Sequence, residues 1–176
     1  MTAAQTTMGT SANELRSRFD ALLASHRKIA FKVSSTYVRE RADREDLAQE
    51  IITQCWRSFA SYDGSRPFST WMYRIALNVA ISFTRNAQYH DRHSVALDHD
   101  SHDIPHDADP EGDERIRALY RFIDLLNPLD RALLLLYLEE RSYREMADIL
   151  GISETNVATK IGRLKLRIRA DMAQDD

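Results

Sequence analysis

The sequence predicts an all-α protein built from two small helical domains that are joined by an acidic linker rich in histidine and aspartate. Apolar residues recur at steps of three and four in both halves of the chain, and no alternating apolar pattern bounded by turn residues predicts a strand. Only five glycines and four prolines occur in 176 residues, as expected for a helix-rich globular chain. The periodic pattern is interrupted at residues 90–114, which hold two prolines and nine acidic residues against one basic residue.

This interruption divides the chain into four segments. We expect a disordered tail at residues 1–10, a first helical domain at residues 11–89, the flexible acidic linker at residues 90–114 and a second helical domain at residues 115–176. The net charge of -3 is therefore unevenly distributed, because outside the linker the basic residues slightly outnumber the acidic ones.

The first domain is predicted to contain three helices. The first starts at a capping box of Ser11 and Glu14, and the second starts at Asp43. A turn at residues 62–67 precedes the third, which Ser69 or Thr70 opens. The inward positions are predicted to be Leu15, Phe19, Leu22, Leu23, Ile29, Ala30 and Val33 in the first helix, Leu47, Ile51, Trp56 and Phe59 in the second, and Trp71, Ile75, Ala76, Val79 and Phe83 in the third.

The second domain ends in a helix-turn-helix pattern. A first apolar stripe stops at Asn127-Pro128, and a short helix over residues 129–140 is apolar nearly all round, which predicts a buried centre. Ser142 and Glu145 then form a capping box, Gly151 occupies the turn, and Ser153 caps the last helix. A small Ala147 and the turn glycine permit the close and steep crossing that this motif needs.

The outward face of the last helix is polar and basic, which predicts binding to duplex DNA. Its members are Thr155, Asn156, Thr159, Lys160, Arg163, Lys165, Arg167 and Arg169. Residues near the start of such a helix reach base edges in the major groove, and later basic residues contact phosphates. The alternative is that the last helix simply exposes a basic face to solvent. DNA binding is favoured because the cap, the turn glycine and the packing pattern occur together with the basic face.

Several stretches together resemble the extracytoplasmic-function (ECF) sigma factors of the main bacterial sigma family. Residues 44–50 (REDLAQE), continuing to Trp56, resemble the helix that docks on core RNA polymerase. Residues 68–76 (FSTWMYRIA) with Asn78 resemble the segment that melts and reads the minus-ten element, whereas residues 126–131 (LNPLDR) and 142–169 resemble the domain that reads the minus-thirty-five element. The resemblance implies a factor that binds core polymerase and directs promoter-specific initiation.

The resemblance also implies three sets of contact residues. Asp46, Leu47, Gln49, Glu50 and Gln54 would bind core polymerase; Tyr62, Ser65, Arg66, Phe68, Trp71, Arg74, Asn78 and Arg85 would bind the minus-ten DNA; Ser153, Thr155, Asn156, Thr159, Lys160, Arg163, Lys165 and Arg167 would bind the minus-thirty-five DNA. The chain departs from many members at Ala158, where a basic residue is common, and at Gly162, which lies inside the predicted helix. The promoter sequence therefore does not transfer from relatives.

The linker histidines, His90, His93, His99, His102 and His106, alternate with aspartates. Such a mixture has ligand types for zinc, nickel or copper, but no rigid spacing fixes a geometry, so we assign no metal and no cofactor. The favoured hypothesis is electrostatic: the acidic linker lies near the basic DNA-binding surfaces of the free protein and discourages non-specific binding.

The partners expected from the sequence are core RNA polymerase, promoter DNA and an anti-sigma factor, with no small-molecule substrate. No catalytic constellation appears, so we expect no enzyme. A single cysteine, Cys55, and the lack of a signal peptide or an apolar run of membrane-spanning length suit the cytoplasm. Two alternatives stay open: a helix-turn-helix regulator that binds duplex DNA alone, and an interaction protein that uses the sigma fold to sequester a regulator.

Overall fold

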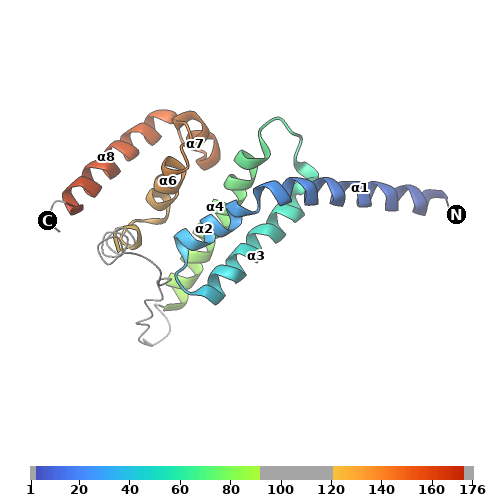
Figure 1. Ribbon diagram of the computed structural model, residues 1–176, viewed down its shortest axis with the longest axis horizontal. Coiled ribbons are helices and arrows are strands. Elements are labelled where there is room, and N and C mark those ends of the chain that lie inside the picture. Colours follow the sequence, from blue (N-terminus) through green and yellow to red (C-terminus); the bar gives the residue numbers. More distant parts are fainter. Residues whose placement is uncertain (1–2, 92–120, 173–176) are drawn as a thin grey trace.

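The structure, a computed structural model, describes residues 3–91 and 121–172, and all regular structure in these two ranges is helical. The N-terminal half contains α1 (Ala3–His26), α2 (Lys28–Tyr37), α3 (Arg41–Ser58), the single 3-10 turn η1 (Phe59–Ser61) and α4 (Phe68–Asp91). The C-terminal half contains α6 (Pro128–Leu138), α7 (Tyr143–Leu150) and α8 (Glu154–Met172). The predicted all-α class is therefore confirmed for the described residues. Figure 1 shows the two halves side by side.

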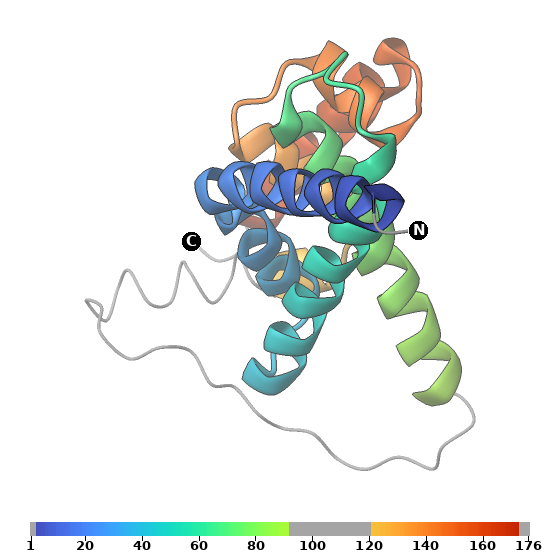
Figure 2. The same cartoon turned by 90° about the vertical axis from the view of Figure 1, so that its right-hand side faces the viewer.

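The N-terminal domain is a bundle in which α2, α3 and α4 pack against one another. Val33, Leu47, Ile51 and Met72 are fully buried where these helices meet. Burying a side chain of this kind contributes roughly 1.5 to 3 kcal/mol. Figure 2 shows α1 running across the other helices, and its Phe19 is buried against the same core.

Two features of the first predicted helix differ in the structure. It begins at Ala3 rather than at Ser11, so residues 3–10, expected as a disordered tail, belong to α1; alanine, glutamine and methionine in this stretch favour helix. The helix is also interrupted at Arg27, which separates α1 from α2. At this break Nδ1 of His26 is hydrogen-bonded to the carbonyl oxygen of Leu22 at 2.8 Å, and side-chain bonds of this type compete with the backbone ladder.

The predicted inward faces of α3 and α4 are partly wrong. Helix α3 starts at Arg41 rather than at Asp43. Trp56, predicted to point inward, is 39% exposed, whereas the neighbouring Cys55 is fully buried. In α4 the buried residues are Met72, Tyr73, Ala76, Leu77 and Ala80, whereas Trp71, Ile75, Val79 and Phe83 are only partly buried. The reason is that α4 packs against α2 and α3 on one side and against α6 and α7 on the other, so its buried arc is wider than one stripe.

The break that the sequence predicts at Asn127-Pro128 is confirmed, because α6 begins at Pro128. The side chain of Asn127 accepts a hydrogen bond from the backbone N–H of Asp130, and Pro128 occupies the first turn of α6. Ala132, Leu133, Leu134 and Leu136 form the buried centre, although Leu138 at the end of the run is 60% exposed. Residues 115–120, where the second domain was predicted to start, lie outside the described ranges, as does nearly all of the predicted linker. His90 and Asp91 belong to α4.

The two domains are in contact, because α4 packs against α6 and α7 while α2 packs against α6. In Figure 1 the orange helices α6 and α7 lie beside the N-terminal bundle. Within the two described ranges, none of the helices combines the length and the hydropathy that a membrane span requires.

Candidate nucleic-acid interface

The helix-turn-helix has the caps that its sequence predicts. At the start of α7 the Ser142 hydroxyl accepts from the backbone N–H of Glu145, and the Glu145 carboxylate accepts from the backbone N–H of Ser142 at 2.9 Å. These hydrogen bonds from Ser142 lower the pKa of Glu145. Gly151 ends α7 in the left-handed conformation at φ 68°, and the Ser153 hydroxyl accepts from the backbone N–H of Asn156 at the start of α8. The turn therefore fixes how α8 is presented.

The outer face of α8 is exposed along its length. Thr155, Asn156, Thr159 and Arg163 are exposed, whereas Val157, Ile161 and Leu164 are buried against α6 and α7. Gly162 also lies on the exposed face, and no side chain or neighbouring backbone approaches the position that its Cβ would occupy. Nothing in the packing of the domain requires a glycine there.

Three of the cations predicted to bind the minus-thirty-five DNA contact their own domain. Lys160 is partly buried and its Nζ lies 3.5 Å from a carboxylate oxygen of Asp130 in α6. The Lys165 ammonium lies 4.5 Å from the centre of the Tyr137 ring, and the Arg167 guanidinium lies 5.7 Å from that of Phe122. The hydrogen bond with Tyr137 also raises the pKa of Lys165. These three side chains thus help to hold α8 on the domain. Arg163, the fourth cation of the predicted minus-thirty-five set, is exposed.

The turn before α4 rests on a cluster of aromatic rings. Phe59, Tyr62, Phe68 and Trp71 lie with ring centres 5.2 to 6.2 Å apart, and the Arg18 guanidinium of α1 lies 5.7 Å from the centre of Phe59. The Tyr62 hydroxyl donates to the carbonyl of Arg66 at 2.8 Å, which closes the turn. Contacts of this kind fix the conformation of a loop that would otherwise be mobile.

The same turn contains an Asx-type hydrogen bond. The backbone N–H of Ser65 donates to the Asp63 carboxylate at 2.9 Å, and hydrogen bonding with Ser65 lowers the pKa of Asp63. Gly64 has a φ of 75°, which a residue with a side chain rarely adopts. The Ser65 side chain is consequently held at the exposed tip of the turn.

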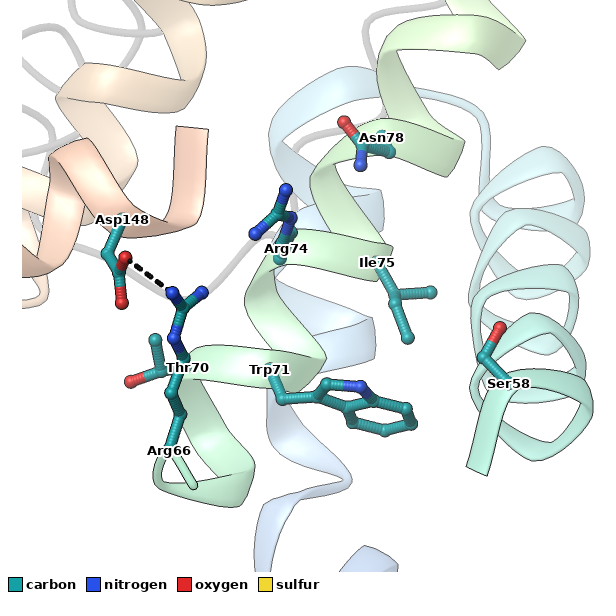
Figure 3. Close-up of a pocket in the computed structure, with 8 residues that line it drawn as sticks. All are labelled: Ser58, Arg66, Thr70, Trp71, Arg74, Ile75, Asn78 and Asp148. Carbon is teal, nitrogen blue, oxygen red and sulfur yellow. Dashed lines mark ion pairs between the residues drawn. The ribbon is translucent and has the colours of Figure 1, made fainter. Parts of the chain in front are cut away.

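A cavity of about 310 Å³ lies between the end of α3, this turn, α4 and α7. Its lining residues are Ser58, Arg66, Thr70, Trp71, Arg74, Ile75, Asn78 and Asp148. Figure 3 shows Trp71 and Ile75 directed toward Ser58 and the ion pair that joins Arg66 to Asp148 of α7. An aromatic wall, a side-chain amide and two guanidinium groups give this site what an unpaired base and its phosphate require.

The predicted core-binding residues form a surface of α3. Asp46, Gln49 and Glu50 are exposed and Gln54 is partly buried, but Leu47 is fully buried. Leu47 therefore packs beneath this surface rather than lying on it, because its position in the helix points toward α2 and α4. Phe68, which was predicted to contact the minus-ten DNA, is likewise only 4% exposed and lies within the ring cluster.

Two sequence matches decide the family. Residues 22–89 match Sigma-70 region 2, and residues 116–168 match Sigma-70, region 4. The chain belongs to the sigma-70 family, as an ECF RNA polymerase sigma factor. It therefore directs transcription initiation at promoters, and the presence of region 2 distinguishes the sigma factor from a regulator that only binds duplex DNA. The family is not a family of catalytic enzymes.

Curated relatives agree with this assignment. The sigma factor is 28% identical over 158 residues to the ECF RNA polymerase sigma-E factor of Haemophilus influenzae, which covers 84% of this chain and 83% of the relative. It is 25% identical over 171 residues to the ECF RNA polymerase sigma factor SigX of Bacillus subtilis, at 90% and 88% coverage. A third relative, the probable RNA polymerase sigma factor RfaY of Xanthomonas campestris, is 24% identical, and the match spans only 37% of its length.

The fold is shared with two sigma factors solved in complexes. The structure of CnrH in complex with the cytosolic domain of CnrY matches with a TM-score of 0.67 at 20% identity and covers 92% of this chain and 91% of the other. The sigma factor RpoE from Bartonella quintana, solved with the anti-sigma factor NepR, matches with a TM-score of 0.65 at 16% identity and covers 93% and 99%.

The structure brings together some of the predicted minus-ten residues and separates others. Arg66, Trp71, Arg74 and Asn78 line one cavity, whereas Arg85 lies seven residues further along α4, about 10 Å away. Sequence reasoning missed Ser58 and Thr70 on the cavity wall, and it missed Asp148 entirely. No local pattern could have identified Asp148, because it reaches the cavity from the other domain.

Proposed function

We propose that the sigma factor makes a two-point promoter contact, with the cavity beside Trp71 receiving an unpaired base of the minus-ten element and the exposed start of α8 reading the minus-thirty-five element. The observation that carries this proposal is the cavity itself, which Trp71, Asn78, Arg66 and Arg74 all line. Stacking of a base on an aromatic contributes about 1 to 3 kcal/mol, which is comparable to the cost of unstacking it.

At the minus-thirty-five element the proposed base contacts come from Asn156 and its neighbours. Asn156 and Thr155 are exposed in the first turn of α8, which is the part of a recognition helix that reaches base edges. The hydroxyl of Thr159 donates to the carbonyl of Thr155 at 2.9 Å, which leaves its oxygen available as an acceptor. Arg163, one turn later, is placed for a phosphate.

Core polymerase is proposed to dock on the exposed carboxylates of α3. Asp46 and Glu50 lie one helical turn apart on the same exposed face, with Gln49 beside them, and an acidic face of this kind fits a basic partner surface. The family match over residues 22–89 supports this docking role. Since core polymerase acts in the cytoplasm, we place the protein there.

An anti-sigma factor is a further proposed partner. The Bartonella quintana structure that shares this fold is described as a sigma factor in complex with an anti-sigma factor. To test for such a partner, proteins bound to this sigma factor are captured, and the captured complex is tested for loss of binding to core polymerase.

Reconstituted transcription tests the promoter-reading proposal. The purified sigma factor is added to core polymerase and a promoter library, and specific transcripts are sequenced. We expect Trp71→Ala to reduce open-complex formation by about tenfold or more, which corresponds to loss of one stacked base, while core binding is unchanged. Phe31→Ala is the matched control, because Phe31 of α2 is an exposed aromatic residue that lies outside the cavity and outside the predicted core-binding set.

Two results would contradict the proposal. Open complexes formed equally well by Trp71→Ala would remove the cavity from promoter melting. A purified protein that protects duplex DNA without core polymerase and yields no transcripts with it would favour the helix-turn-helix regulator instead.

A further inference from the structure

The first two turns of α8, residues 154–160, form the part of the helix-turn-helix that is placed to reach base edges. Their exposed side chains are Glu154, Thr155, Asn156, Ala158 and Thr159. Guanine presents only acceptors in the major groove, so its recognition requires donors, most often those of arginine or lysine. None of these five side chains is a cation, and Glu154 is an acid. The exposed part of these turns therefore lacks the groups that guanine recognition commonly uses.

The one cation in these two turns is engaged within the domain. The Lys160 ammonium lies 3.5 Å from a carboxylate oxygen of Asp130 in α6, and the two side chains are only 28% and 15% exposed. A base contact by Lys160 would leave the Asp130 carboxylate largely buried without its cation, which is unfavourable. Lys160 therefore stays with α6, and the bases meet uncharged side chains.

Three of the exposed side chains present methyl groups on one face of the helix. Thr155, Ala158 and Thr159 are spaced by three and four residues, and such positions share one side of a helix. The Thr159 hydroxyl donates to the Thr155 carbonyl at 2.9 Å, so it offers DNA a methyl group and an acceptor oxygen. Ala158 offers a methyl group alone, where many family members have a basic residue. The apolar group that matches these side chains in the major groove is the C5-methyl of thymine.

Asn156 supplies a polar contact of the same base preference. Its side chain is exposed in the first turn, and its backbone N–H is fixed by the hydrogen bond to the Ser153 hydroxyl at 3.2 Å. A side-chain amide has a donor and an acceptor that match N7 and N6 of adenine. Adenine is the base that pairs with thymine, so A·T pairs satisfy both the amide and the methyl groups.

Short side chains contact bases only when the helix lies close to them. Apolar groups are in contact when their heavy atoms are within about 4.5 Å, and the Ala158 methyl is attached directly to the backbone. Gly162 is exposed four residues later on the same side of α8, and the position of its Cβ is open. A glycine inside a helix weakens the helix relative to alanine, and the packing of the domain gives no reason for it. The missing Cβ permits close approach of this backbone to a ligand.

We propose that the first two turns of α8 read A·T pairs in the minus-thirty-five element. The methyl groups of Thr155, Ala158 and Thr159 contact thymine, and the amide of Asn156 contacts adenine. Gly162 is a positioning residue that lets α8 lie close to the groove. This inference rests on the proposed function, because it assumes that α8 enters the major groove at this element, and it goes beyond it by naming the base pairs that are read.

Promoters selected from a randomised library test the base preference. The parent chain and the variant Thr155→Ser, Thr159→Ser, which keeps both hydroxyls but loses both methyl groups, are each combined with core polymerase. We expect the minus-thirty-five positions whose preference weakens in the variant to be A·T pairs in the parent selection. An unchanged selection, or G·C pairs at the positions that change, would overturn the proposal.

Removal of the thymine methyl group tests the contact itself. In the selected promoter, thymines of the minus-thirty-five element are replaced by deoxyuridine, which lacks only the C5-methyl. We expect the parent holoenzyme to bind about fourfold more weakly for each contacted thymine, the effect of one buried methyl group, and the serine variant to lose less. Deoxyuridine in the spacer between the elements is the control and should have no effect. Equal losses in parent and variant would mean that the shape of A·T-rich DNA is read instead, against the proposal.

Gly162→Ala separates the fit to DNA from the stability of the domain. We expect this variant to melt a few degrees higher, because alanine favours helix. The holoenzyme should nevertheless bind the selected promoter about fivefold more weakly, because the added methyl group keeps α8 away from the groove. Binding to core polymerase and to a single-stranded minus-ten oligonucleotide should not change. Promoter binding equal to that of the parent would refute the close approach of α8.

This inference and the proposed function fail in different ways. If transcription requires the minus-thirty-five element, but deoxyuridine and Gly162→Ala have no effect, the reading of A·T pairs is wrong and the two-point contact stands. If replacing the whole element and Asn156→Ala both leave transcription unchanged, α8 does not read this element, and both proposals are overturned.

Discussion

At the scale of single residues, two positions share one backbone conformation but carry different side chains. Gly151 ends α7 with a φ of 68°, and Glu140 follows α6 with a φ of 56°. At the second position the backbone N–H of Arg141 bonds to the carbonyl of Leu136, so Glu140 occupies the left-handed site where helices usually have glycine. The left-handed conformation costs a residue with a Cβ roughly 1 to 2 kcal/mol.

These positions give opposite predictions for stability. We expect Glu140→Gly to raise the free energy of unfolding by about 1 kcal/mol and Gly151→Ala to lower it by about the same amount. Both follow from the backbone, since no atom lies near the Cβ position of Gly151. Urea denaturation of the full chain, with hydrogen exchange to locate the change in the C-terminal domain, measures both. A stabilised Gly151→Ala would contradict the argument.

At the scale of helices, the sequence predicted best those features that depend only on neighbouring residues, such as helix caps and turns. The caps at Ser142 and Ser153 and the turn at Gly151 are confirmed, because each depends on residues within four positions. The inward faces of α3 and α4 were partly wrong, since burial there depends on which neighbours surround a helix. The cluster of the Phe59, Tyr62, Phe68 and Trp71 rings was likewise visible in the sequence only as separate aromatic residues.

The cations of α8 show the same limit within one helix. They look equivalent in sequence, but Lys160 faces Asp130 while Arg163 faces solvent. Asp130 also accepts a hydrogen bond from the Asn127 side chain at 2.7 Å, so Lys160 belongs to the support of α6 and α8. Position around the helix, relative to α6, decides which lysine or arginine remains available to DNA.

Three substitutions in α8 should therefore have different effects. Asn156→Ala is expected to lose about 1 to 3 kcal/mol of discrimination at one base pair. Arg163→Ala should weaken binding to all sequences and reduce the salt slope by about one. Lys160→Ala should mainly lower the free energy of unfolding, by about 1 kcal/mol. Binding of the chain to duplex libraries over a salt series, alongside thermal unfolding, separates the three; a salt slope lowered equally by Lys160→Ala would contradict the division.

At the scale of the whole molecule, the relative placement of the domains could not be predicted from sequence. Lys32 and Glu139 are 107 residues apart, and nothing in either local pattern marks the other as its partner. The sequence predicted an acidic segment that screens the basic DNA-binding surfaces, but Arg66 of the predicted minus-ten set pairs with Asp148 of the other domain. The role of the segment itself stays a prediction, because residues 92–120 lie outside the described ranges.

The length of that segment supplies the last prediction. The 29 residues between Asp91 and Arg121 can span about 100 Å when extended, enough for a separation of roughly 85 Å between promoter elements. Deleting residues 95–112 reduces the reach to about 40 Å. We expect this variant to bind core polymerase and a single-stranded minus-ten oligonucleotide normally, but to lose transcription from promoters that need both elements.

A replacement of residues 95–112 by glycine and serine at equal length separates reach from charge. Because a flexible chain of the same length keeps its span, this variant should retain transcription. It also removes most of the acidic groups, so non-promoter DNA affinity at fixed salt should rise if those groups screen the basic surfaces. Full transcription by the deletion variant would mean that the domains reach both elements without the segment, and the two-point geometry would then have to come from bending of the DNA.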